Sequence, residues 1–351
     1  YHPNDNLIFK IGAPNIVMGT AETLYPTVES DGSFTINIPL YHHTQVRMMI
    51  GNADLVILLS PEKETNVAIN LSNPPGKQFV FSGQYATINN EWCQPELITK
   101  IPPVYSDGDL LDSIVGISAN EFKKRCINQY KRYVTHNNAQ LQFSEDTRTL
   151  ANLSCAFDCL ENLQATHYCL QTAYQKKENI TREQAFAAFL DVYLPDDFHN
   201  YLKDFPVNHP LALYCYNYRN VVMDLYDTHK DPLAYEKNLL KNAPLTKEEQ
   251  TLIHQYETAF KAGISFQQES ELMALSAKYF KENDLFRWES FSKAKERLSN
   301  IIQDSTSLIV DYIRAIYMRS SFYNLQPLTP RQELMASEIT NPIFLGIIQD
   351  M

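Results

Sequence analysis

The chain has 351 residues, enough for two or more packed units that each bury a core. Its 30 basic and 41 acidic side chains give a net charge of -11, and the acidic ones are scattered rather than gathered in a tail. This charge argues against nucleic acid and anionic membranes as partners, because both bind clustered Lys and Arg. No stretch approaches the roughly 18 to 20 consecutive apolar residues that span a bilayer, so we expect no transmembrane segment.

The chain starts at Tyr1, without an initiator Met and without a charged start followed by an apolar core. A secretory signal, if there was one, is therefore expected to have been removed. Six of the ten glycines fall before residue 84, and none lies between Gly116 and Gly263. This shift in composition predicts a boundary near residue 85, with one unit over residues 1–85 and a second over residues 86–351.

Short strands are predicted along residues 1–85. After the turn dipeptide Asp31-Gly32, apolar residues at 34, 36, 38 and 40 alternate with polar residues or proline, which predicts a strand with one buried face. Further apolar runs occupy residues 7–11, 46–50, 55–59, 67–71 and 79–81, with a turn at Pro61-Glu62. The spacing of these runs predicts a small β sandwich.

Helical signals replace this pattern after residue 85. Helix starts are predicted at the capping-box pairs Thr181 with Gln184 and Thr246 with Glu249, and at Thr329 followed by Pro330. Amphipathic stretches are predicted at 117–141, 145–175, 182–193, 210–227, 247–262, 267–282 and 286–319. No fixed repeat period accompanies them, and the connections at Pro195, Pro206, Pro210, Pro232 and Pro244 are short. The predicted fold class is α+β, mostly α, with an irregular helical bundle.

No complete catalytic, cofactor or metal site is found in the sequence. Trp92-Cys93-Gln94-Pro95 is similar to a thioredoxin-type site, but Glu96 stands where the second Cys would be. We interpret Trp92 as an anchor of the first helix against the β module, with a buried Cys beside it. Phosphate-binding glycine loops and hydrolase motifs are absent, and Asp196-Asp197 is explained by capping of a short helix.

The other thiols and the histidines also favour structural roles. The six cysteines are residues 93, 126, 155, 159, 169 and 215, with no C-x-x-C spacing. Cys155 and Cys159 share a helix face, where two thiols are usually small buried apolar residues. His42 and His43 would point to opposite faces of a strand, and His199 and His209 could meet only through folding. We therefore expect no zinc site and assign no catalytic residue, cofactor or metal ligand.

Tyrosine is over-represented, at 21 residues, with one cluster at Tyr214, Tyr216 and Tyr218 and another at Tyr312, Tyr317 and Tyr323. Exposed tyrosines can form recognition surfaces, since each combines a large apolar area with a polar tip. The first cluster is therefore the candidate binding surface. The alternative, which the helical spacing favours, is that these tyrosines are half-buried filler between helices.

The order of several short phrases resembles the amino-terminal region of envelope TlpA/ResA-like thiol-disulfide oxidoreductases of the thioredoxin superfamily. The phrases are residues 31–40 (DGSFTINIPL), 58–62 (LLSPE), 81–83 (FSG), 89–91 (NNE), 328–330 (LTP) and 341–342 (NP). Glu62 stands where the family commonly has Gly. The thioredoxin domain with its Trp-Cys-x-x-Cys site does not occur in this sequence, so the resemblance transfers no catalytic residue.

Two functions follow as expectations. The resemblance implies a non-catalytic accessory region that positions a carboxy-terminal thioredoxin domain and binds envelope protein substrates, exported to the periplasm or cell envelope, with a lipid anchor upstream of Tyr1 allowed. The alternative is a stand-alone envelope protein that binds a small molecule or glycan in a helical groove lined by Tyr214, Tyr216 and Tyr218. Whether the parent protein is an enzyme depends on which of the two holds, because the chain itself offers no active site.

Overall fold

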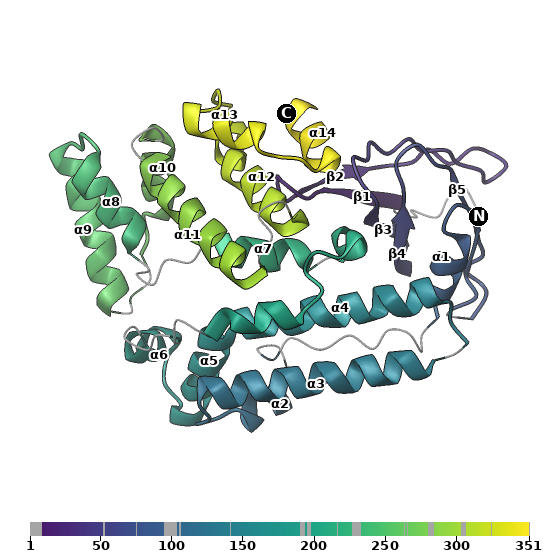
Figure 1. Ribbon diagram of the computed structural model, residues 1–351, viewed down its shortest axis with the longest axis horizontal. Helices are drawn as coiled ribbons and strands as arrows, with labels where there is room; N and C mark the ends of the chain where they lie inside the picture. The colour runs from purple at the N-terminus through teal and green to yellow at the C-terminus, as the bar shows by residue number, and fades with distance from the viewer. Residues whose placement is uncertain are drawn as a thin grey trace.

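The computed structural model describes residues 9–51, 53–74, 76–94, 104, 107–140, 142–189, 194, 198–215, 217–226, 233–262, 264, 266–279, 284–302, 307–323 and 325–350. It is 59% helical with 12% strand, so the fold is α+β and mostly α, which confirms the predicted class. Figure 1 shows the strands at one end of the molecule and the helices over the rest.

Two antiparallel sheets form the β module. The first has the order β2-β1-β3-β4 and the second pairs β5 with β6. Their bounds are β1 (Phe9–Asn15), β2 (Thr20–Leu24), β3 (Thr44–Ile50), β4 (Ala53–Leu59), β5 (Thr65–Ile69) and β6 (Phe79–Gly83). Both sheets contribute to one apolar cluster, in which Met48 of β3, Ile57 of β4 and Phe81 of β6 are buried. Strand β2 was not predicted, because its side chains are almost all exposed and carry no apolar alternation.

The predicted strand over residues 34–40 is wrong in one respect. The apolar side chains from Phe34 to Leu40 are half-buried and alternate with exposed neighbours, as predicted. The segment nevertheless belongs to neither sheet, because no described strand pairs with it. Period-two burial requires only an extended backbone beside a core, whereas a strand assignment requires a partner backbone within hydrogen-bonding distance.

The helical region follows as α1 (Ala86–Trp92), α2 (Gly108–Ser113), α3 (Ala119–Ala139), α4 (Glu145–Gln164), α5 (Thr166–Glu178), α6 (Arg182–Phe189), η3 (Phe198–Asp204), η4 (Pro210–Tyr214), α7 (Tyr218–Tyr226), α8 (Ala234–Asn242), α9 (Lys247–Ala262), α10 (Glu269–Lys278), α11 (Asp284–Ile302), α12 (Leu308–Tyr323), α13 (Pro330–Ser337) and α14 (Pro342–Asp350).

All three predicted helix starts are confirmed by side-chain to backbone hydrogen bonds in both directions, at α6, α9 and α13. Three predicted stretches are each divided. Residues 145–175 are divided between α4 and α5, which meet at Ala165, residues 210–227 contain η4 and α7, and residues 286–319 contain parts of α11 and α12. Periodicity alone missed these breaks, because the apolar pattern continues through them.

The largest apolar cluster lies among the helices and also takes in part of the β module. Ile16 and Val17 from the β1–β2 turn and Leu58 of β4 are buried in the same cluster as Phe157 of α4 and Tyr312 of α12. The strands end at Gly83 and the helices follow, but residues of both regions share this core. The predicted boundary between two units near residue 85 therefore stays a prediction.

Nothing in the part of the chain that the structure describes has the length and apolar character of a membrane-crossing helix.

Candidate functional site

Helix α1 joins the two sheets through two consecutive asparagines. The buried Asn89 accepts a hydrogen bond from the Leu58 N–H (2.7 Å) and donates one to the Leu58 carbonyl (3.0 Å). Asn90 makes the same pair of bonds with the N–H (2.8 Å) and carbonyl (3.0 Å) of Phe81. Leu58 lies on β4 and Phe81 on β6, so each amide satisfies the backbone at the edge of a different sheet.

The next residue, Glu91, connects the same helix to the start of α4. Its carboxylate accepts hydrogen bonds from the Ser144 N–H (3.0 Å), from the Ser144 hydroxyl (2.6 Å) and from the Thr147 hydroxyl. Ser144 is the N-cap of α4, where unpaired N–H groups and the helix dipole favour an anion. Residues 89–91 therefore bind β4, β6 and α4 in succession, and we call them the α1 clamp.

Trp92 and Cys93 complete this junction without forming a redox site. Trp92 packs against Phe143 and Ala151 of the helical region, and Cys93 packs against the core of the β module. The interpretation of Trp92 as an anchor against the β module needs a correction, since Trp92 packs against the main helical core and is not among the residues packed on the core of the β module. Burial raises the pKa of the Cys93 thiol to about 11, the opposite of the lowered pKa that activates a thioredoxin-type cysteine. Pro95 and Glu96 lie outside the described residues.

The remaining cysteines are buried in the helical core. None of the six cysteines forms a disulfide, and only Cys93 keeps partial exposure. Burial raises the pKa of Cys126 and Cys215 to about 12 and that of Cys155 to about 11. The thiolate is the reactive form, so these thiols are poor nucleophiles at neutral pH.

We expect the folded protein at pH 8 to react with a thiol reagent such as Ellman's reagent far more slowly than the denatured chain does. All six thiols should titrate in denaturant. In the native state the rate should be limited by opening of the core, except at Cys93. A fast-reacting pair of thiols in the native chain would contradict this assignment.

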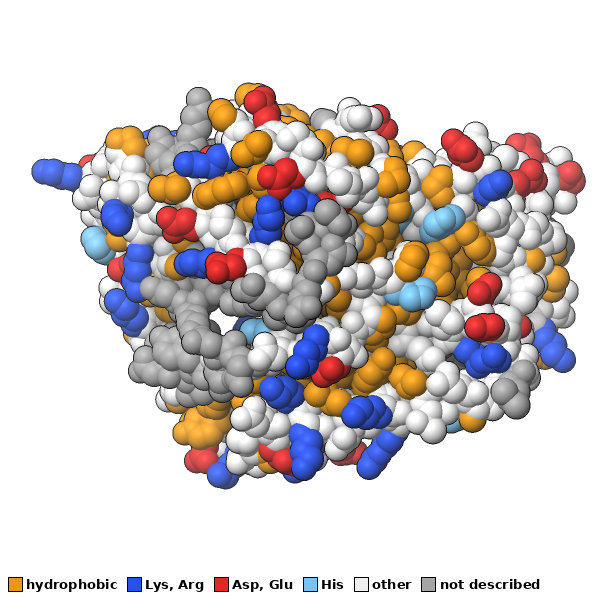
Figure 2. Space-filling view, viewed as in Figure 1, with side chains coloured by type: hydrophobic (Ala, Val, Ile, Leu, Met, Phe, Trp, Pro, Cys, Tyr) orange, Lys and Arg blue, Asp and Glu red, His pale blue; other side chains and the backbone are white. Residues whose placement is uncertain are grey.

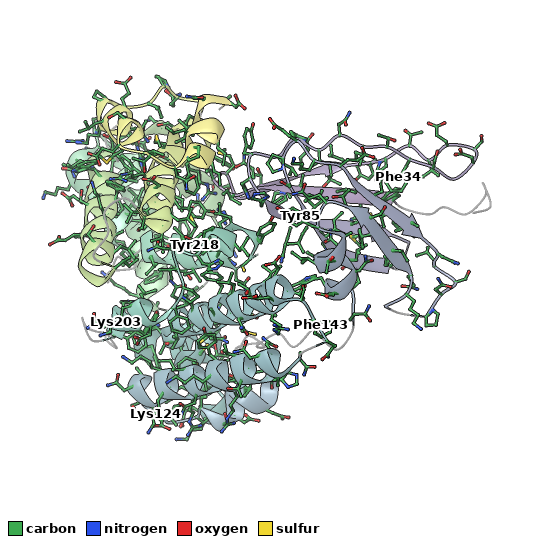
Figure 3. The ribbon with its side chains drawn as sticks, turned by 45° about the vertical axis from the view of Figure 1, so that its right-hand side comes forward. Phe34, Tyr85, Lys124, Phe143, Lys203 and Tyr218 are labelled. Atoms are coloured by element: carbon green, nitrogen blue, oxygen red, sulfur yellow. The ribbon has the colours of Figure 1, made fainter. Side chains whose placement is uncertain are left out.

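His42 and His43 lie where the β module meets the helices. His42 is buried, and its Nδ1 lies 2.5 Å from the His43 carbonyl, so Nδ1 carries the proton and donates. The His43 ring stacks on Tyr214 at 5.5 Å, and the Tyr85 hydroxyl lies 3.0 Å from the His43 Nδ1. Figure 3 shows Tyr85 on the side of the β module that faces the helices. The pair is thus part of an aromatic contact between the two regions.

Burial lowers the pKa of His42 from 6.5 to about 4. The neutral form is favoured in the folded state, so stability is present above pH 6.5 and is lost as the pH falls from 6.5 toward 4. We expect this group to contribute a slope of about 1.4 kcal/mol per pH unit in that window. Urea unfolding of wild type and His42→Gln at pH 7, 6, 5 and 4 would measure it; equal slopes in both proteins would contradict the assignment.

The candidate binding surface is not exposed in the structure. Tyr214 is 3% exposed and Tyr218 is 1% exposed. The Tyr218 hydroxyl donates to the Val207 carbonyl (2.9 Å), and its ring packs on Phe157 and Tyr312. Figure 3 shows Tyr218 deep among the helices. Tyr216 lies outside the described residues. The packing of α7 on α4 and α12 buries Tyr218, and Tyr214 at the end of η4 is buried beside His43 and Tyr85, so both are core filler rather than a groove lining.

The second tyrosine cluster has two buried members and one exposed member. Tyr312 and Tyr317 are fully buried, whereas Tyr323 at the end of α12 is 68% exposed. The Tyr312 hydroxyl donates to the Ile16 carbonyl (2.7 Å), and Arg219 Nε donates to the same oxygen (3.1 Å). These two bonds fix the β1–β2 turn to the helical core.

His199 and His209 have separate local contacts. His209 caps η4, its Nδ1 accepting from the Leu211 N–H (3.1 Å), and the His199 ring lies tilted beside Tyr201 with the centroids 6.0 Å apart. Within the described ranges, no group of three or more His, Cys, Asp or Glu side chains could hold a metal ion. Asp196 and Asp197 lie outside those ranges.

A buried ionic network holds the last three helices together. Asp311 of α12 accepts from Arg314 Nη1 (2.6 Å) and from the N–H groups of Thr340 (3.0 Å) and Asn341 (2.8 Å) at the start of α14. Arg314 also donates to Glu338 (3.0 Å), which Lys295 of α11 reaches at 2.9 Å. The local sequence pattern did not predict this network. Its hydrogen-bonded pairs are 3 to 43 residues apart in the sequence, and the packing of the helices brings them together.

No family model, curated protein or solved structure matches this chain.

Several of the contacts described above connect the β module to the helices, namely the α1 clamp, the Ile16 contacts and the His43–Tyr214 stack. Figure 2 shows apolar side chains spread over the face where the two regions meet. In the sequence, residues 89–91 stand out only as one of the phrases that resemble the oxidoreductase family. Their role as a clamp follows from their hydrogen bonds to Leu58, Phe81 and Ser144.

Proposed function

We propose that this chain is the non-catalytic positioning and partner-binding region of an envelope thiol-disulfide oxidoreductase, whose chemistry belongs to a thioredoxin-fold domain outside this sequence. The observation that carries the proposal is the α1 clamp. Its residues, Asn89, Asn90 and Glu91, are one of the phrases in which the chain resembles that family, and they fix both sheets and α4 to one another. A rigid platform of this kind suits a positioning role.

The thiols support the same proposal from a second direction. A thiol-disulfide reductase needs a thiolate at neutral pH, and burial raises the pKa of Cys93, Cys126, Cys155 and Cys215 instead. Any reducing activity of the parent protein would therefore come from cysteines outside this chain. Export to the periplasm or cell envelope follows from the resemblance and is part of the proposal.

The decisive experiment is the intact mass of the native protein, with and without alkylation after reduction. We expect a mass above the 40.4 kDa of this chain by roughly the 100 to 150 residues of one more domain, with one additional reactive thiol pair in the excess. A native mass near 40.4 kDa would overturn the proposal and would favour a stand-alone binding protein.

A second experiment tests the positioning role in the native full-length protein. Asn90→Ala changes a half-buried residue and should loosen the clamp at the Phe81 backbone without unfolding the chain. We expect slower reduction of a protein disulfide such as insulin and an unchanged rate with a small disulfide reagent. The matched control is Asn242→Ala, an exposed asparagine in α8, which should change neither rate. If Asn90→Ala also changes neither rate, the clamp has no part in substrate selection.

A further inference from the structure

Residues 25–40 form an open hairpin at the outer end of the β module. The tip is closed by two backbone hydrogen bonds, from the Glu29 N–H to the Ser33 carbonyl (2.8 Å) and from the Gly32 N–H to the Glu29 carbonyl (2.9 Å). The Asp31 carboxylate accepts from the Ser33 N–H (2.9 Å), and Gly32 has a φ of 86°, which favours glycine. The tip is thus a well-formed turn.

Beyond this tip the two arms do not pair. The first arm, residues 25–28, and the second arm, residues 34–40, both alternate between half-buried and exposed side chains, as strands do. Val28, Phe34 and Ile36 pack against the core of the β module, which holds both arms extended. Apart from the bonds at the tip, the backbone of neither arm makes a hydrogen bond to any described residue. Two rows of backbone donors and acceptors are therefore left without a partner among the described residues.

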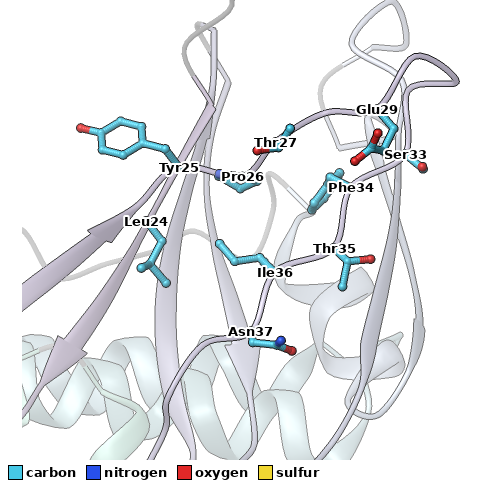
Figure 4. A pocket seen from close by; sticks show the side chains of 10 residues that line it. All are labelled: Leu24, Tyr25, Pro26, Thr27, Glu29, Ser33, Phe34, Thr35, Ile36 and Asn37. Carbon is cyan, nitrogen blue, oxygen red and sulfur yellow. The ribbon is translucent and has the colours of Figure 1, made fainter.

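A hollow of about 420 Å³ separates the arms. It is lined by residues 24–27 on one side, by residues 33–37 on the other, and by Glu29 at the tip. Figure 4 shows the two arms on either side of this space. A strand inserted between two others lies about 4.8 Å from each and pairs with both through its backbone. Glu29 and Ser33 bond to each other at the tip, so an extended peptide would pair with the two arms beyond that bond.

The charge around the hollow specifies the peptide further. No Lys or Arg occurs from residue 11 to residue 46, whereas Glu22, Glu29 and Asp31 are acidic. All three acidic side chains are exposed, and Glu29 lines the hollow. An extended segment that carries Lys or Arg at its ends would complement this potential, while an acidic segment would be repelled.

We infer that the space between residues 24–28 and 33–38 is a binding site for one extended, basic polypeptide segment, which adds as a strand between the two arms. The inference rests on the backbone and charge of this hairpin and not on the proposed redox role. It goes beyond that role by naming a site and a class of ligand. Main-chain hydrogen bonds would supply the affinity, and the acidic tip would select the ligand.

The probe is a blocked heptapeptide, acetyl-Lys-Thr-Val-Thr-Val-Thr-Lys-amide, compared with the same peptide N-methylated at both Val residues. N-methylation removes two backbone donors and leaves the charge unchanged. We expect Kd to rise at least about tenfold, since each hydrogen bond contributes of order 1 kcal/mol. Saturating parent peptide should slow amide hydrogen exchange in residues 25–28 and 34–38. Equal binding of the two peptides, or binding without this protection, would overturn the inference.

Two charge reversals test the acidic tip. The turn is closed through the backbone of Glu29, so Glu29→Lys changes the charge and keeps these bonds. The substitution should raise Kd for the parent peptide about threefold or more. Glu64→Lys makes the same change of charge at an exposed site before β5, outside the hollow, and should leave Kd unchanged. Equal effects of both variants on Kd would show a general charge effect and would overturn the acidic tip as the feature that selects the ligand. No binding up to about 1 mM peptide would overturn the site itself.

Discussion

Replacing Asn89 with alanine is expected to lower the free energy of unfolding by about 2 to 4 kcal/mol. The Asn89 amide is fully buried and satisfies both the N–H and the carbonyl of Leu58. Alanine removes both bonds and leaves two buried backbone groups unpaired, each at a cost of about 1 to 3 kcal/mol. Urea unfolding followed by circular dichroism measures the change through the transition midpoint, with the slope m unchanged.

The matched control is again Asn242→Ala. Asn242 is exposed at the end of α8, and its amide donates to the Asn238 side chain one turn away. We expect a change within about 0.5 kcal/mol, as for surface substitutions in general. If Asn89→Ala costs no more than the control, the Asn89 bonds to Leu58 do not hold α1 to β4, and the clamp fails as an explanation of the junction.

The second large effect is expected at Asp311. Asp311→Ala removes the carboxylate that faces the buried Arg314 guanidinium and should cost about 3 to 5 kcal/mol, because the buried charge loses its fully buried partner and keeps the partly exposed Glu338. The same change deprives the N–H groups of Thr340 and Asn341 of their acceptor. Amide exchange in α14 should therefore accelerate more than exchange in α4, which does not touch this network.

An exposed ion pair provides the contrast. Arg47 and Asp54 form a salt bridge across β3 and β4 with side chains that are 63% and 41% exposed. Asp54→Ala should cost less than about 1 kcal/mol, since water solvates both charges when the pair is broken. A loss at Asp311 no larger than that at Asp54 would show that the buried network contributes little to stability.

Local chemistry made part of this fold predictable. The helix starts at Thr181, Thr246 and Thr329 were read correctly because a capping box forms between residues three apart, and the neighbours in sequence are the partners in space. The strands at β3 and β4 were read correctly because their apolar runs are short and bounded by turn residues. These features depend on a few consecutive residues.

The candidate site was much less predictable. Tyr214 and Tyr218 were named as a binding surface, and the packing of η4 and α7 against the rest of the molecule buries both. Asn89 and Asn90 gave no sign of their role, because an asparagine amide can cap, turn or clamp, and only the position of Leu58 and Phe81 selects among these. Sequence periodicity predicts which side chains face the core, but it does not predict which residues they contact there.

The sequence by itself determined the α+β class, the three capped helix starts and the alternation of residues 34–40, because each depends on local hydrogen bonding or on a local repeat of apolar side chains. Tertiary structure alone decided that no described strand pairs with residues 34–40, that α1 clamps two sheets, and that Asp311 holds α14. The Asn89–Leu58 and Asp311–Asn341 contacts join residues 31 and 30 positions apart, and the packing of the whole core brings such residues together.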